Sequence, residues 1–183
     1  MNKIITFAAA LAVAGTGRAY AGGQANSLGI GAEFGLDGET GGASVNYDAG
    51  LYHVGGFLGF KDGFDGNEDN SNDTSYTIGG RFYWHLHKTA MSDFGIGGGL
   101  GLFSAPGVNG TPPGSGDRVY RFYVEPGFQI RLFVASNVAL SFSAGFTLGF
   151  VDTEGVSFGA PSIGTAAGFG AVNGSAGIHY YFF

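Results

Sequence analysis

The chain has 183 residues, enough for one domain, and it combines 37 glycines and 18 phenylalanines with only 12% charged residues. Its mean hydropathy of +0.16 is too low for a bundle of membrane-spanning helices. The net charge of −6 without a basic cluster is unfavourable for nucleic-acid binding, and the absence of cysteine excludes disulfides and thiolate metal sites.

The first 21 residues predict a cleaved secretory signal. Lys3 supplies a positive start, residues 4–14 form an apolar core, and Ala19-Tyr20-Ala21 is a small-x-small cleavage site. The apolar stretch is shorter than the roughly 20 residues that a helix needs to cross a bilayer. We therefore expect residues 1–21 to be removed and residues 22–183 to form one domain.

Strict alternation of apolar and polar or small residues predicts strands along the rest of the chain. Eight segments show it, and most have the length of about 9–11 residues that a tilted membrane-spanning strand needs. The expected strands are 28–36, 43–49, 51–61, 76–87, 94–103, 120–133, 138–150 and about 170–183.

The connections alternate in length. Short turns are expected at 48–50, 88–93 and 135–137, and long loops at 62–74, 104–118 and 152–169. Short turns on one side and long loops on the other are typical of outer-membrane barrels. The sequence therefore predicts an all-β fold, an eight-stranded antiparallel up-and-down transmembrane barrel.

The apolar face of the strands is expected to point outward. Around Phe82, Phe128 and Phe142 this face carries no charge, whereas the other face is rich in Gly and Ser with isolated charges of both signs. Aromatic residues near strand ends are typical of an interfacial girdle. A run of four alternate glycines at 95–101 would leave room in the lumen for long side chains on neighbouring strands.

With the signal peptide, the alternating strands, the acidic long loops and the terminal Phe183, the chain resembles the small eight-stranded outer-membrane barrels, the group around the OmpA transmembrane domain, OmpX/Ail and the opacity-type proteins. In the last strand, alternation directs Phe182 outward rather than the terminal aromatic. Either a bulge near Gly177 or a register shifted by one residue would remove that difference.

Charged residues on the inward face are expected to form an ion-pair and hydrogen-bond network, since an unpaired charge in a lumen filled by side chains is costly. The predicted network comprises Glu33, Arg81, Arg121, Glu125 and Arg131, with Asp48, His53, His85 and His179 also inward. Arg81, Arg121 and Glu125 are expected at its centre. A metal at His85 and His87 is disfavoured because no carboxylate lies nearby in sequence, and neither a metal nor a cofactor is expected.

The expected long loops carry the candidate surface residues. The first is densely acidic, which suits either a solvated surface loop or a divalent-cation site without EF-hand spacing. The third contains apolar residues and could extend the barrel as a hairpin or contact a partner. The predicted loop residues are Asp62, Asp65, Glu68, Asp69, Asp73, Phe158 and Ile163.

No catalytic constellation stands out, and we expect a non-enzymatic barrel in the outer membrane of a Gram-negative bacterium, with both termini periplasmic. It would display loops for envelope integrity or surface contact and adhesion. Expected partners are outer-membrane lipid and lipopolysaccharide, periplasmic chaperones, the barrel-assembly machinery and a possible surface partner, but no nucleic acid. The alternatives are a narrow channel or lateral path for small molecules, and a lipid-modifying enzyme.

Overall fold

The computed structural model describes residues 24–35, 41–61, 74–106, 118–151, 155–158 and 173–183. The predicted signal peptide and the loop residues Asp62, Asp65, Glu68, Asp69, Asp73 and Ile163 lie outside these ranges. Among the residues that are described, no helix has the length and apolar character needed to cross a membrane.

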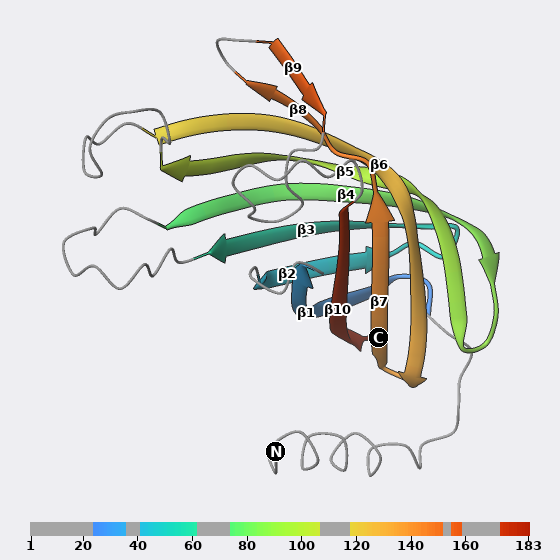
Figure 1. Cartoon of the computed structure of the whole chain (residues 1–183). Helices are drawn as coiled ribbons and strands as arrows, with labels where there is room; N and C mark the ends of the chain where they lie inside the picture. The colour runs from blue at the N-terminus through green and yellow to red at the C-terminus, as the bar shows by residue number, and fades with distance from the viewer. Residues whose placement is uncertain (1–23, 36–40, 62–73, 107–117, 152–154, 159–172) are drawn as a thin grey trace, which may run out of the picture.

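The described part of the chain is all-β (Figure 1). Its strands, in chain order, are β1 (Ser27–Gly35), β2 (Gly41–Asp48), β3 (Tyr52–Lys61), β4 (Ser75–Lys88), β5 (Ser92–Pro106), β6 (Arg118–Ala135), β7 (Val138–Gly145), β8 (Leu148–Val151), β9 (Gly155–Phe158) and β10 (Asn173–Phe182).

Eight strands close into a ring. Each of β1 to β6 pairs antiparallel with the next strand in the chain. β7 then pairs with β10, and β10 pairs with β1 to close the ring. The seam runs in unbroken register from Leu28 opposite Phe182 to Gly35 opposite Ser175. The predicted eight-stranded antiparallel barrel is therefore confirmed, and its strands curve around one interior (Figure 1).

The expected strand 138–150 is interrupted in the structure. β7 pairs with β6 as far as Gly145 opposite Gly127, and β8 resumes with Leu148 opposite Val124. Pro126 lies at the break, and a proline has no N–H to donate to the ladder. Its carbonyl still accepts a hydrogen bond from the Phe146 N–H at 3.0 Å.

Two of the three expected long loops are shorter than the sequence indicates, whereas 62–74 keeps its expected bounds. β5 continues to Pro106, and the segment assigned to the third loop contains β9, which pairs with β8 as a hairpin. This hairpin includes Phe158 and projects from the rim of the barrel (Figure 1). Of the two interpretations of that segment, the structure favours an extension of the barrel wall.

The three short turns, 49–51, 89–91 and 136–137, lie at one end of the barrel, which we call the turn end. Two backbone hydrogen bonds bring the first and last strands to this end, from the Asn26 N–H to the Asp48 carbonyl at 2.6 Å and from the Tyr181 N–H to the Asn137 carbonyl at 2.7 Å. Gly50 adopts a φ of +91°, which favours glycine at this turn.

The outer surface is a belt of exposed apolar side chains, as the alternation predicts. Tyr180 and Phe182 also face outward, while Tyr181 is buried, and β10 shows no register shift near Gly177. The direction expected for Phe182 is therefore confirmed. We use the name apolar belt for the exposed residues Leu28, Ile30, Phe34, Val45, Leu58, Phe60, Ile78, Phe82, Ile96, Leu100, Leu102, Phe122, Phe128, Ile130, Leu132 and Phe142.

Candidate functional site

The interior of the barrel holds the candidate functional residues, and the glycines of β5 make space for them. A Cβ added at Gly99 would lie 3.2 Å from Cγ of Arg81, and one added at Gly101 would lie 2.7 Å from the hydroxyl of Tyr123. Gly99 and Gly101 are therefore covered by long side chains from β4 and β6, whereas Gly97 lies against the backbone of β4. This confirms the packing expected from the sequence.

A first cluster surrounds Arg131 near the turn end. Its Nε donates to Asp93 Oδ1 at 2.9 Å, and a terminal nitrogen donates to Asp93 Oδ2 at 2.7 Å and Asp48 Oδ2 at 2.6 Å. The other terminal nitrogen donates to the Tyr181 hydroxyl at 2.9 Å. Arg131 is fully buried, and this cluster joins β2, β5, β6 and β10 across the lumen.

Two histidines complete the first cluster. His85 Nδ1 lies 2.9 Å from the carbonyl of Gly50, and its Nε2 lies 2.7 Å from His53 Nδ1 and 3.0 Å from an Arg131 nitrogen. With its proton on Nδ1, His85 donates to the Gly50 carbonyl, and the single lone pair of Nε2 can accept from His53 Nδ1, because that Arg131 nitrogen already donates its two hydrogens to Asp93 and Asp48. A bulge between His85 and His87 leaves His87 exposed, so the two do not share a face.

Asp48, His85 and Asp93 together could offer ligand atoms for a metal, since one from each lies within 4.8 Å of the others. The Arg131 guanidinium contacts all three of these side chains. A cation would have to displace a buried positive charge that already neutralises both carboxylates. The arrangement therefore serves as an internal ion-pair cluster.

A second cluster lies around Glu33, farther from the turn end. Its carboxylate pairs with Arg81 from β4, and Oε1 lies 3.5 Å from Nε2 of His179 on β10. The Arg81 guanidinium also stacks 4.4 Å above the centre of the Phe57 ring. Glu33 and His179 are buried. This cluster therefore ties β1 to β4 and β10 from the inside.

The second cluster differs from the expected centre of Arg81, Arg121 and Glu125. Arg81 has Glu33 as its direct ion-pair partner, while Glu125 acts on it electrostatically and accepts a hydrogen bond from Thr147 at 3.2 Å. Among the described residues Arg121 forms no ion pair, and its buried Nε has no hydrogen-bond partner. Alternation places a residue on the inner face, but it does not specify which partner across the lumen it meets.

The comparisons with known proteins give a structural likeness. No protein-family model and no curated protein matches the sequence. The structure is similar to the crystal structure of the N-terminal β-barrel domain of Pseudomonas aeruginosa OprF, with a TM-score of 0.57 and 12% identity over 86% of this chain and 98% of that one. The chain has the fold of a small eight-stranded outer-membrane barrel.

At 12% identity the likeness concerns the fold alone, since one fold can carry many functions.

One arrangement in the interior of the barrel has the residue types of a hydrolase triad. Ser44 Oγ lies 2.6 Å from His179 Nε2, and Glu33 is beside it. In a working triad the serine and the acid contact opposite ring nitrogens. Here both contact Nε2, so Glu33 does not orient the histidine as a base for Ser44.

Two buried members of the first cluster are absent from the predicted network, namely Asp93, which falls in the expected turn 88–93, and Tyr181. Asp93 lies in β5 and is buried at 2% exposure. The alternation in the sequence does indicate this position, because Asp93 lies two residues before Gly95 and therefore on the same, inward face of the strand. Tyr181 follows from the alternation of Tyr180 and Phe182, but its bond to Arg131 required the closed ring.

Proposed function

We propose that the chain is a non-enzymatic barrel of the outer membrane of a Gram-negative bacterium, which anchors its longer connecting segments for envelope integrity or surface contact. The observation that carries the proposal is the apolar belt around a polar, ion-paired interior. Soluble monomers rarely expose apolar patches larger than a few hundred Å². A closed barrel also satisfies its backbone hydrogen bonds, as hydrocarbon surroundings require.

The ends of the strands support an orientation. Aromatic side chains border the belt at both ends, with Tyr47, Trp84 and Tyr180 near the turn end and Tyr76 and Tyr120 at the other. Such girdles are found at membrane–water interfaces, and short turns face the periplasm in barrels of this kind. The described N-terminal strand starts, and the C-terminal strand finishes, at the turn end. We therefore place both termini in the periplasm.

The filled interior favours anchoring over transport. Arg131 crosses the lumen near one end and the Arg81–Glu33 pair crosses it farther in, so charged side chains occupy the path at two levels. The space beside the β5 glycines, which would have supported a channel or lateral path, is taken by Arg81, Tyr83 and Tyr123. In this proposal the longer connecting segments, at the end of the barrel opposite the turn end, carry the function through contacts with lipopolysaccharide or a surface partner. Periplasmic chaperones and the barrel-assembly machinery would deliver the chain.

The test is single-channel recording of the refolded protein in a planar bilayer. We expect inserted protein, shown by protection from protease in parallel vesicles, without current steps. Reproducible steps that change on Arg81→Gln or Glu33→Gln would replace anchoring by a narrow channel. A lipid-modifying enzyme would instead change the lipid A mass spectrum of cells that express the chain, relative to cells that carry Ser44→Ala.

A further inference from the structure

The wall of the barrel divides where β7 ends. Up to Gly145, β7 is paired on both sides, with Gly127 of β6 and with Asn173 of β10. Beyond that level β8 continues in the same register, with Leu148 opposite Val124 of β6, but its second neighbour is β9 rather than β10. We call the hairpin of β8 and β9 the flap. In the part of the chain that the structure describes, the flap is paired with the ring along β6 only.

The junction between β7 and the flap has few backbone hydrogen bonds. Because the register is unchanged across it, Phe146 stands opposite Pro126 and Thr147 opposite Glu125. The Phe146 N–H donates to the Pro126 carbonyl at 3.0 Å. Opposite residues at such a position in an antiparallel ladder exchange two hydrogen bonds, but a proline has no N–H for the second. The ladder therefore lacks one of its bonds at the junction.

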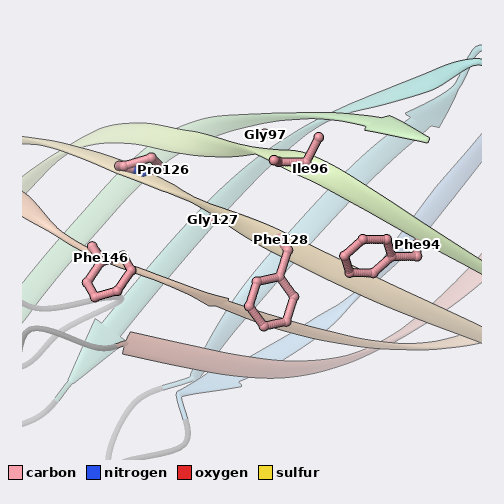
Figure 2. Close-up of a pocket in the computed structure, with 7 residues that line it drawn as sticks. All are labelled: Phe94, Ile96, Gly97, Pro126, Gly127, Phe128 and Phe146. Atoms are coloured by element: carbon pink, nitrogen blue, oxygen red, sulfur yellow. The ribbon is translucent and has the colours of Figure 1, made fainter. Parts of the chain in front are cut away.

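The outer side of the junction is loosely packed. An apolar hollow of about 510 Å³ lies there, with Pro126 and Phe146 at one end and Phe94, Ile96 and Phe128 toward the other (Figure 2). The Phe146 side chain is 58% exposed. Segments with few packing contacts open locally at a low free energy. The outer face therefore adds little to hold the junction together.

On the inner side a side-chain contact spans the junction. Thr147 is 1% exposed, and its hydroxyl donates to a carboxylate oxygen of Glu125 at 3.2 Å. Glu125 also lies against the end of β7, because a Cβ added at Gly145 would be 3.2 Å from its Cγ. The Glu125 side chain thus meets the opposite strand on both sides of Phe146, and it supplies a link where the proline removes one.

We propose that the flap is a hinged part of the wall, which opens about residues 146–147 and is held closed by the hydrogen bond from Thr147 to Glu125. Opening separates β8 from the four residues 121–124 of β6, whereas the ring of β1 to β7 and β10 keeps its ladders. An isolated two-stranded hairpin is marginally stable at best, so the opened flap can change its shape. The inference goes beyond the anchoring role proposed above, because the hinge belongs to the fold itself.

The experiment is hydrogen–deuterium exchange with mass spectrometry on protein isolated from membranes of cells that express the full chain. It is done in detergent micelles and in phospholipid vesicles. We expect the amides of 146–151 to exchange several-fold faster than those of 138–145. Thr147→Val keeps the shape of the side chain but removes the donor, so it should raise exchange in 146–151 several-fold further. Pro126→Val restores a backbone N–H and should slow this exchange.

Ser143→Ala is the matched control. It removes another buried bond between neighbouring strands, from Ser143 of β7 to Ser175 of β10 at 2.6 Å, which does not span the junction. It should leave exchange in 146–151 unchanged, whereas an increase as large as that in Thr147→Val would contradict a specific role of the Thr147 bond.

Three results would overturn the hinge. They are equal exchange in 138–145 and 146–151, a Thr147→Val effect spread evenly over all strands, and unchanged exchange in Pro126→Val. The micelle measurement needs no bilayer. Protein that fails to insert into vesicles therefore refutes the membrane location alone, and the exchange pattern in micelles still decides the hinge.

Discussion

Arg131 donates a hydrogen bond to the carboxylate of Asp48 at 2.6 Å, which joins β6 and β2 across the full width of the barrel. Both side chains are completely buried. Neighbouring strands are held by their backbone ladders, but these two strands are not neighbours. The pair therefore acts as an internal brace that the sheet hydrogen bonds cannot supply.

Replacing Arg131 with methionine should destabilise the barrel by about 3–5 kcal/mol, since it leaves Asp48 and Asp93 buried without their cation. The measurement is urea unfolding in lipid vesicles, followed by the fluorescence of Trp84, the one tryptophan of the chain. Adding Asp48→Asn and Asp93→Asn to the methionine variant should restore part of the loss. Equal stability of Arg131→Met and the wild type would show that the brace contributes nothing.

Glu33 and Arg81 should be energetically coupled. Because they contact each other directly, Glu33→Gln and Arg81→Gln should be non-additive by about 0.5–3 kcal/mol in a double-mutant cycle. Arg121→Gln provides the control, since the ion pairs of Glu33 among the described residues are with Arg81 and His179. Its effect should add to that of Glu33→Gln. The same coupling in both cycles would contradict the pairing that the structure shows.

Gly97→Ala should destabilise the barrel by about 1–3 kcal/mol, the usual cost of overpacking. A Cβ at this position would overlap the Phe82 carbonyl oxygen and lie 2.8 Å from the Tyr83 Cα. Gly80→Ala is the control, because its Cβ would meet the Gly55 carbonyl oxygen at an ordinary 3.5 Å. We expect that change within about 0.5 kcal/mol of the wild type. Heat-modifiable migration on gels would report the folded fraction of each variant.

The proposed membrane location predicts a depth-dependent cost of charge on the outer face. Leu58→Arg places a cation in the apolar belt and should cost about 2–4 kcal/mol in vesicles, whereas Leu51→Arg, at a turn, should cost about 0–1 kcal/mol. Both leucines are exposed, so a water-soluble barrel would tolerate the two changes equally. Unfolding free energies of the two variants distinguish these cases.

The wall of this barrel could be predicted from the sequence to a large extent, because the alternation that directs Leu58 outward and Phe57 inward is local information. The pairs that side chains form across the lumen could not be predicted in this way. Arg131 meets Asp48 from 83 residues earlier only because strands on opposite sides of the ring face each other at that level. Pairing of this kind depends on the stagger of the strands, which no single segment encodes.

The break between β7 and β8 and the bulge beside His85 were also beyond periodic reasoning. An unbroken alternation through Phe146 and Thr147 still places Phe146 outside and Thr147 inside, as the structure has them. What alternation does not reveal is that Pro126, on the partner strand, interrupts the ladder. The bulge likewise leaves His87 outside the inward face that period-two counting assigns to it.

The seam between β1 and β10 imposes an order of events on the chain. The strand that begins at Ser27 finds one of its two partners only in residues 173–182, so the ring cannot close until nearly all of the sequence has been delivered. Contacts over such separations form slowly. Until the ring closes, the chain has two unpaired strand edges and an apolar surface exposed to water, and both favour aggregation. For the exported barrel proposed above, the time before closure is thus the period in which the chain most needs a chaperone.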